Sequence, residues 1–243
     1  MKTTKELTES KTSLISQQQV TWQGRDEWFF NREYTDRYED YYEGPYKEAE
    51  RDQKSVLEQL IKADERVEDI LEFGCGTTRF TRWWPDIGLE STGGDISPFM
   101  LSQALYRFDG DLVMADSHHL PFKDQSYDAV GFITTFEYYK DPVQVLQEAA
   151  RVAKYGIIMG MMNRNTPKII RRRAQQAVGK NQYYNTATFY TPRTLRKIID
   201  KALQGRKYTL KWHCTGLPKW FPIKKWDVPV GDFFGMYIQF TDR

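Results

Sequence analysis

The sequence predicts an α/β fold, in which a parallel sheet is covered by helices on both faces. Two observations support this class. Short apolar runs alternate with helix-like segments between residues 48 and 162, and such alternation is typical of parallel strands joined by crossover helices. Three helix starts also carry a capping residue followed by proline, which fits the first helical position: Ser97-Pro98, Asp141-Pro142 and Thr191-Pro192.

Length and composition limit the class of protein. With 243 residues, 40% of them hydrophobic and 28% charged, the chain suits one large globular domain. The net charge of +2 favours neither a nucleic-acid surface nor a membrane surface. Two cysteines are too few for a disulfide framework or a metal cluster. Residues 1–19 lack the apolar core of a signal peptide, and the longest apolar run, Tyr155–Met162, is too short to span a bilayer, so we expect a cytoplasmic protein.

The N-terminal part of the chain changes character along its length. We expect residues 1–20 to be a disordered tail, because Ser, Thr, Lys and Gln dominate there. Residues 22–46 are rich in Trp, Phe and Tyr, so this segment should pack either as a lid over a ligand site or as a cover of the core. Residues 48–62 then form an amphipathic helix, with apolar residues at helical spacing: Val56, Leu57, Leu60 and Ile61.

A glycine-rich bend follows the first predicted strand. An apolar run over 69–73 leads into Gly74 and Gly76, and a helix-like pattern follows over 77–84. Glycines at these positions let the main chain bend sharply and come close to a ligand, and the start of a helix offers unpaired N–H groups to it. A bend of this kind is also found in ordinary strand-to-helix turns, so its meaning depends on what lies further along the chain.

Asp95 supplies the second half of this pattern. It lies 95 − 74 = 21 residues after Gly74, at the end of a second apolar run over 89–94. A carboxylate there can accept hydrogen bonds from two ribose hydroxyls, which indicates a nucleoside site. A dinucleotide dehydrogenase would need Gly or Ala where this chain has Arg79, so Arg79 argues against that class.

Three further strands are predicted over 111–115, 127–133 and 155–162. Polar and aromatic residues follow the first two of them, at the carboxyl edge where ligands of open α/β sheets bind: Asp116, Ser117, His118, Thr135, Phe136, Glu137 and Tyr138. The adjacent His118 and His119 cannot share one face of a helix or strand, so we expect no metal site there.

The last part of the chain is predicted to contain two helices and two strands. The helix over 168–178 is strongly basic, with Lys168, Arg171, Arg172 and Arg173. This helix presents either a solvated face, which we favour, or a clamp for an acidic ligand. A helix over 192–203 follows, and the segments 208–215 and 235–241 alternate with period two, as strands do.

Several of these motifs resemble those of class I S-adenosylmethionine-dependent methyltransferases of the type 11 kind. The run over 69–81 resembles the family's first motif, and Asp95 stands where the family has its ribose-binding acid. The Leu120-Pro121-Phe122 turn with the strand after it, and the helix start over 190–195, are also similar. The chain departs from the family at Thr78, where a third glycine is usual, and at Tyr138, where many members have histidine.

The resemblance implies a Rossmann-like, seven-stranded, mostly parallel sheet with helices on both faces, an antiparallel last strand and an N-terminal helical lid. It implies one domain over 21–243. Within it, 21–62 would form the lid, 63–162 the cofactor-binding half, and 163–243 the substrate-side and sheet-closing half.

The resemblance also implies S-adenosylmethionine as the cofactor and a role for each site residue. A carboxylate such as Glu72 can pair with the amino group of the methionine part, and Asp116 can accept from the adenine amino group or cap its own turn. Thr135 or Phe136 would approach the sulfur. The residues expected to bind the cofactor are Glu72, Gly74, Cys75, Gly76, Asp95, Ile96, Asp116, Ser117 and Thr135, with Tyr34 of the lid.

Three residues are candidates for a general base in the transfer: Glu137, Tyr138 and His118, although Glu137 is alternatively a structural acid. We expect methyl transfer to a small-molecule acceptor by a monomer or homodimer, without a nucleic-acid or membrane partner. An RNA or protein methyltransferase, with 171–173 as its footprint, and a non-catalytic cofactor-binding relative are the alternatives. The Asn/Asp-Pro-Pro-Tyr motif of amino-directed nucleic-acid methylases is absent from the sequence.

Overall fold

The computed structural model describes residues 27–42, 46–180, 182–215 and 231–242. Seven strands form a single sheet in the order β3-β2-β1-β4-β5-β7-β6. Only β7 runs antiparallel to its neighbours, β5 and β6, and all the other pairs are parallel. The strands are β1 (Asp69–Phe73), β2 (Glu90–Asp95), β3 (Leu112–Met114), β4 (Tyr127–Ile133), β5 (Ala153–Met162), β6 (Tyr208–Cys214) and β7 (Phe233–Phe240). The predicted fold class is therefore confirmed.

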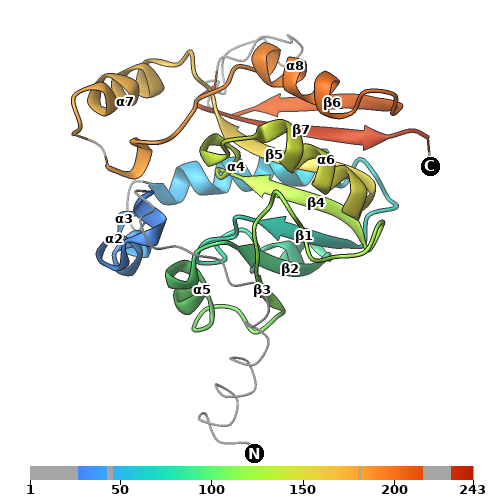
Figure 1. Cartoon of the computed structure of the whole chain (residues 1–243), viewed down its shortest axis with the longest axis horizontal. Helices are drawn as coiled ribbons and strands as arrows, with labels where there is room; N and C mark the ends of the chain where they lie inside the picture. Colours follow the sequence, from blue (N-terminus) through green and yellow to red (C-terminus); the bar gives the residue numbers. More distant parts are fainter. Residues whose placement is uncertain (1–26, 43–45, 181, 216–230, 243) are drawn as a thin grey trace, which may run out of the picture.

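Helices cover both faces of this sheet (Figure 1). The α-helices are α2 (Arg32–Asp36), α3 (Tyr38–Tyr42), α4 (Tyr46–Ile61), α5 (Pro98–Ala104), α6 (Pro142–Val152), α7 (Pro167–Ala177) and α8 (Pro192–Ala202). Short 3₁₀ helices are η2 (Trp28–Phe30), η3 (Trp84–Ile87), η4 (Phe136–Tyr138) and η5 (Gln182–Tyr184). None of the helices described here is both long enough and apolar enough to cross a membrane.

Alternate residues of the central strands pack on opposite layers. Ile157 and Met159 of β5 belong to one core together with α6 and α8, whereas Ile158 between them belongs to a second core with α4. This is the side-chain alternation of a strand buried on both faces. The cap-and-proline helix starts are confirmed as well, since the side chains of Ser97, Asp141 and Thr191 accept hydrogen bonds from the first turns of α5, α6 and α8.

The prediction of a helix over 77–84 is wrong. Consecutive turns occupy this stretch and lead into η3. Thr78, at the position where the family usually has its third glycine, adopts φ = 69°, and a residue in the left-handed region cannot continue a right-handed helix. Isolated helical bonds remain, such as Arg82 N–H to the Thr78 carbonyl oxygen at 3.0 Å.

The aromatic N-terminal segment packs where the parallel strands end. Trp28 is buried and stacks on Tyr38, with ring centroids 5.2 Å apart, and it also contacts Tyr138 of η4 and Tyr183 of η5. Figure 1 shows α2, α3 and α7 together at this end of the sheet. The expected disordered tail over 1–20 and Trp22 lie outside the described residues.

Candidate active site

A cavity opens at the carboxyl edge of the parallel strands. The loops that follow β1, β2, β3 and β4 all contribute to its wall, among them the residues Gly74, Ile96, Asp116 and Thr134. The cavity volume is about 250 Å³, more than ten times the roughly 10–15 Å³ that one water needs. The cavity can therefore hold a ligand, and it lies where ligands of open α/β sheets bind.

The glycine bend is held against β2 and the loop after β4. Gly74 and Gly76 have φ values of 76° and 55°, and the Gly74 amide donates to the carbonyl oxygen of Gly94 at 2.7 Å. A side chain at Gly74 would place its Cβ 2.6 Å from the Cβ of Thr135 and closer still to the Thr135 hydroxyl. Glycine is required here because only a residue without Cβ lets the two loops come together.

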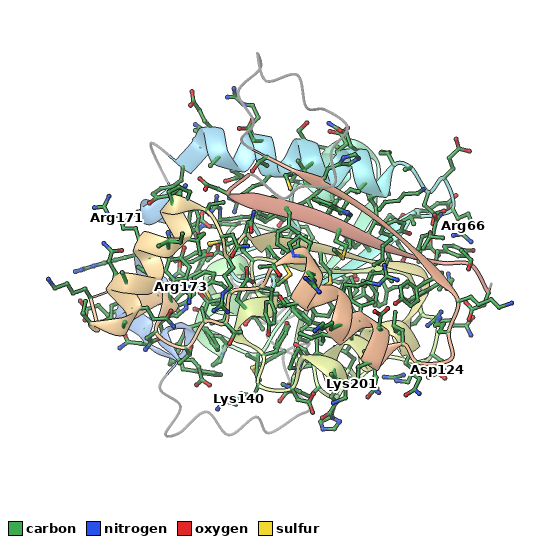
Figure 2. All side chains as sticks on the ribbon, turned by 90° about the horizontal axis from the view of Figure 1, so that it is seen from above. Arg66, Asp124, Lys140, Arg171, Arg173 and Lys201 are labelled. Carbon is green, nitrogen blue, oxygen red and sulfur yellow. The ribbon has the colours of Figure 1, made fainter. Side chains whose placement is uncertain are left out.

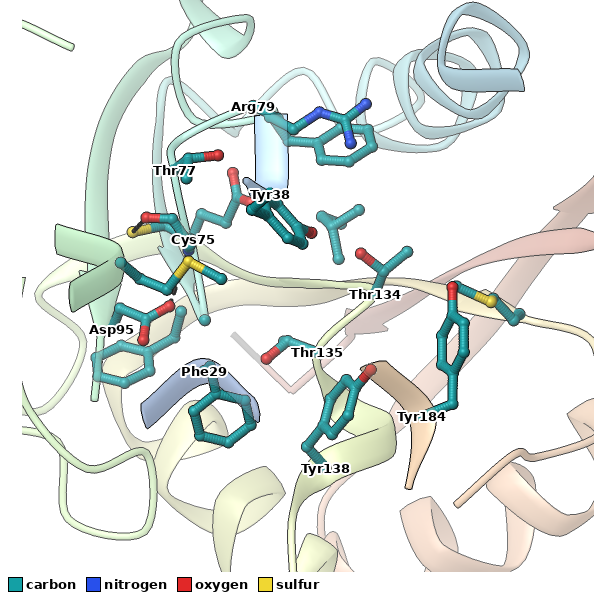
Figure 3. A pocket seen from close by; sticks show the side chains of 18 of the residues that line it. Phe29, Tyr38, Cys75, Thr77, Arg79, Asp95, Thr134, Thr135, Tyr138 and Tyr184 are labelled. Carbon is teal, nitrogen blue, oxygen red and sulfur yellow. Dashed lines mark hydrogen bonds between the residues drawn. The ribbon is translucent and has the colours of Figure 1, made fainter. Parts of the chain in front are cut away.

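Asp95 joins the bend to the second strand. Its Oδ2 accepts from the Gly76 amide and its Oδ1 from the Ser97 amide, both at 2.8 Å. The side chain is 7% exposed and lines the cavity, and burial raises the pKa of its carboxyl to about 6. The Ile96 amide makes a third interaction with this carboxylate. Because a carboxylate has about four acceptor positions, about one remains for a ligand hydroxyl. Figure 3 shows Asp95 at one side of the cavity, near Cys75.

Glu72 forms part of the cavity floor beneath the bend. Its Oε2 accepts from the Thr81 hydroxyl at 3.0 Å and from the Trp84 indole N–H at 2.9 Å. The side chain is 1% exposed, and burial raises the pKa of its carboxyl to about 8. A positively charged group of a ligand beside Glu72 would favour the ionised form of this carboxyl. A protonated amino group of a ligand could then form an ion pair with it.

The loop after β3 supplies a polar corner of the cavity. Asp116 Oδ1 accepts from the His118 amide at 3.0 Å and lies 2.6 Å from His118 Nδ1. Ser117 is buried, and its hydroxyl donates to the Tyr139 phenol oxygen at 3.0 Å. Ile96 also lines the cavity. The predicted nucleoside residues after β2 and β3 are thus gathered on one wall.

The candidate bases occupy different surroundings. His118 and Tyr138 line the cavity, whereas Glu137 is not among the described residues that line it. Glu137 is a buried residue of η4, and its Oε1 accepts from the Met162 amide at 3.0 Å, which suits a structural role. Tyr138 donates its hydroxyl to the Tyr183 carbonyl oxygen at 2.6 Å, and burial raises its pKa far above the ordinary value, so the phenol stays protonated.

Two other predicted residues lie outside the part of the cavity lining that the structure describes. Tyr34 contacts Tyr183 instead, with ring centroids 5.9 Å apart, and Phe136 is fully buried in the core. Their neighbours Tyr38 and Thr135 line the cavity. Tyrosines stand four residues apart at 34, 38, 42 and 46, and the last three of these line the cavity. Tyr34 belongs to α2, whereas Tyr38 and Tyr42 belong to α3 and Tyr46 begins α4, so the break between α2 and α3 separates Tyr34 from the others.

Several lining residues are not indicated by the sequence patterns. Arg79, which argues against a dehydrogenase, lines the cavity with its guanidinium stacked on Tyr42 and paired with Glu50. Met100 of α5 and Tyr184 of η5 line it too. No local signal marks Met100, whereas Tyr184 follows another tyrosine, Tyr183, in an aromatic pair that could have drawn attention to it.

Fold and site together define the class of protein. The seven-stranded sheet with one antiparallel strand, the glycine bend after β1 and the carboxylate at the end of β2 are features of the class I methyltransferase fold. Comparison with known proteins agrees, because residues 71–159 match the sequence family of the methyltransferase domain. This part of the chain is a methyltransferase domain of the class I kind, and the cofactor of that class is S-adenosylmethionine.

Individual relatives share part or all of this domain. An uncharacterised protein of Methanocaldococcus jannaschii is 29% identical over 168 residues, which cover 68% of this chain and 78% of that protein. A demethylmenaquinone methyltransferase of Thermotoga maritima is 36% identical over 104 residues, or 42% of this chain and 44% of the relative, so the chain matches less than half of that enzyme. A crystal structure from Thermotoga maritima, described as a methyltransferase and possible histamine N-methyltransferase, covers 88% of this chain and 100% of its own, with 20% identity and a TM-score of 0.63. That last similarity concerns the fold.

Proposed function

We propose that this protein transfers the methyl group of S-adenosylmethionine to a small-molecule acceptor and releases S-adenosylhomocysteine. The observation that carries the proposal is the junction of Asp95 with the Gly76 amide at 2.8 Å on the cavity wall. A buried carboxylate with an acceptor position left for a ligand thus lies beside a main-chain bend that lines the cavity.

Each wall of the cavity suits one part of the cofactor. Asp95 would accept from the ribose hydroxyls, and Glu72 would pair with the amino group of the methionine part. The corner formed by Ile96, Asp116 and Ser117 would hold the adenine. Thr135, which packs against Gly74, would then lie near the sulfonium.

The chemistry that remains for the protein is mainly positioning. The sulfonium is a good leaving group, so the acceptor and the methyl group need to be held in line at near-attack distance. Trp28, Phe29, Tyr38 and Tyr138 line the cavity and would exclude water from the reaction. In this role the aromatic N-terminal segment acts as the lid considered in the sequence analysis. His118, whose Nδ1 lies beside Asp116, is the better placed of the two candidate bases that line the cavity.

The enclosure of the cavity supports a small acceptor. Aromatic side chains of the N-terminal segment and η4 line the cavity, and a small molecule would suit such an enclosed site. The names of two relatives, a demethylmenaquinone methyltransferase and a possible histamine N-methyltransferase, also refer to small-molecule acceptors.

Calorimetric titration with S-adenosylhomocysteine tests the proposal. We expect wild-type protein to bind it, and Asp95→Ala to weaken binding by at least about tenfold, since hydrogen bonds to a charged group contribute roughly 1.5–3 kcal/mol each. Asp86→Ala, an exposed aspartate outside the described cavity lining, is the matched control and should bind like the wild type. Absence of binding by the wild type, or equal affinity of Asp95→Ala and wild type, would refute the proposed site.

A further inference from the structure

The cavity has a second end, away from the nucleoside wall. Figure 3 shows Asp95 and Tyr184 at opposite sides, with Thr134 and Thr135 between them. The second end is lined by residues of β5, α7 and η5: Met162, Lys168, Ile169, Arg172 and Tyr184. If the nucleoside lies against Asp95 and the reactive sulfur near Thr135, this second end is where the acceptor binds. The inference drawn here therefore rests on the proposed function.

Two of the four basic residues of α7 face this end of the cavity. Lys168 and Arg172 are four residues apart, so they share one face of the helix, and both line the cavity. Arg171 and Arg173 are not among the described lining residues. Figure 2 shows Arg171 at the outer edge of the molecule, and its side chain is exposed. The helix thus divides its positive charge between solvent and cavity.

Arg172 is held in a defined orientation. Its guanidinium lies 4.8 Å from the centre of the Tyr184 ring, and its Nη1 donates to the Met162 sulfur at 2.9 Å. Ile169, one turn before it, is 1% exposed and fixes α7 on a small core with Tyr184. A guanidinium stacked on a ring directs its N–H groups outward in its own plane, which is the geometry that binds a carboxylate through two parallel bonds.

The charges at this end favour a singly charged anion over a doubly charged one. Lys168 and Arg172 supply two positive charges, Lys168 lies 3.7 Å from Asp232, and Asp52 of α4 adds a second carboxylate to the lining. The formal charge of these four groups is therefore about zero. A phosphate group carries nearly two negative charges at neutral pH and would meet two nearby carboxylates, so a carboxylate fits better.

The body of the acceptor should be aromatic. Tyr46, Tyr138 and Tyr184 line the cavity around the two cations, and flat rings stack favourably on such side chains. We propose that the methyl acceptor is an aromatic molecule bearing a carboxylate, which Arg172 binds with Lys168 one turn away on the same face of α7. The carboxylate anchors the acceptor at α7, and the nucleophilic atom faces the sulfonium near Thr135.

Matched aromatic probes test this assignment. We would titrate 2-naphthoate, neutral 2-naphthamide and 2-naphthyl phosphate into protein saturated with S-adenosylhomocysteine and measure affinity by calorimetry. We expect naphthoate to bind at least about tenfold more tightly than the amide. Arg172→Met should abolish this preference, whereas Arg171→Met, on the outer face of the same helix, should retain it.

Each result separates the inference from the proposed function. Binding of S-adenosylhomocysteine, measured for every variant, shows that the protein is folded and that the nucleoside site works. If it binds and naphthoate shows no preference over the amide, if neither probe binds, or if the preference survives Arg172→Met, the inference is wrong. Tighter binding of the phosphate than of naphthoate would overturn the choice of a carboxylate. If wild type does not bind S-adenosylhomocysteine, the proposed function fails, and the inference fails with it.

Discussion

Replacing Gly74 with alanine tests how closely the bend after β1 packs on the loop after β4. The new Cβ would lie 2.6 Å from the Thr135 Cβ and closer still to its hydroxyl. Gly76 offers a matched control within the same bend. It also has a positive φ, 55° against 76°, but a Cβ there meets nothing nearer than the Met100 sulfur at 3.9 Å. The two substitutions therefore share backbone strain and differ in the collision with Thr135.

The magnitudes follow from these two terms. Placing alanine in the left-handed region costs roughly 1–2 kcal/mol, so Gly76→Ala should lower the free energy of unfolding by about that amount. Forcing extra atoms into a packed contact adds roughly 1–3 kcal/mol, so Gly74→Ala should cost about 2–5 kcal/mol. Removal of the Thr135 side chain in the double variant Gly74→Ala/Thr135→Gly should abolish the second term.

Equilibrium urea unfolding, followed by tryptophan fluorescence, measures these differences. The comparison requires equal m-values, which show that the variants expose similar surface on unfolding. In a double-mutant cycle, Gly74→Ala should cost about 1–3 kcal/mol less in the Thr135→Gly background than in wild type. The reasoning is refuted if Gly74→Ala costs no more than Gly76→Ala, or if its cost is the same in both backgrounds.

Two further predictions concern stability. Burial raises the pKa of Glu137 from 4.5 to about 7, so the folded protein binds this proton more tightly than the unfolded chain does. The protonated side chain therefore contributes up to about 3 kcal/mol to the free energy of unfolding. This contribution is fully present below about pH 4.5 and is lost as the pH rises through 7. In denaturant titrations, the free energy of unfolding of Glu137→Gln should therefore fall less steeply between pH 5 and 8 than that of the wild type. The control Glu65→Gln, at an exposed position, should retain the wild-type slope. Identical slopes for Glu137→Gln and the wild type would contradict this prediction. Thr191→Ala removes the capping box of α8 and should lower the free energy of unfolding by about 1 kcal/mol in the same assay. Lys197→Ala, at an exposed position of the same helix, should change it by less than about 0.5 kcal/mol. Equal effects of the two substitutions would show that the cap contributes nothing.

Local features of the chain were predicted well because they depend on neighbouring residues. A cap such as Ser97 or Thr191 acts on amides two or three residues away, and the proline after it fixes a backbone angle by its own ring. The apolar runs that became β1, β4 and β5 are short and bounded by turn residues, so the alternation of strands and helices could be predicted from the sequence.

The stretch after the bend shows where local reasoning fails. Helix-like spacing over 77–84 predicted a helix, yet Thr78 takes a left-handed conformation that its β-branched side chain disfavours. Thr78 is fully buried, and the bend before it is tied to Gly94 and packed on Thr135. Contacts with β2 and with the loop after β4 outweigh the local preference, and no window around Thr78 contains them.

By itself, the sequence determined the class of fold, the glycine bend and the spacing of Asp95 that brings a carboxylate to it. Only the tertiary structure decided which side chains reach the cavity: Tyr38 of α3 rather than Tyr34 of α2, and Arg172 rather than Arg171 within α7. Residues of one helix differ only in angle about its axis, and that angle acquires meaning when the helix is docked on the sheet. Docking is set by many apolar contacts between residues far apart in the chain, such as Ile169 of α7 with Tyr184, so the composition of the cavity is a property of the assembled fold.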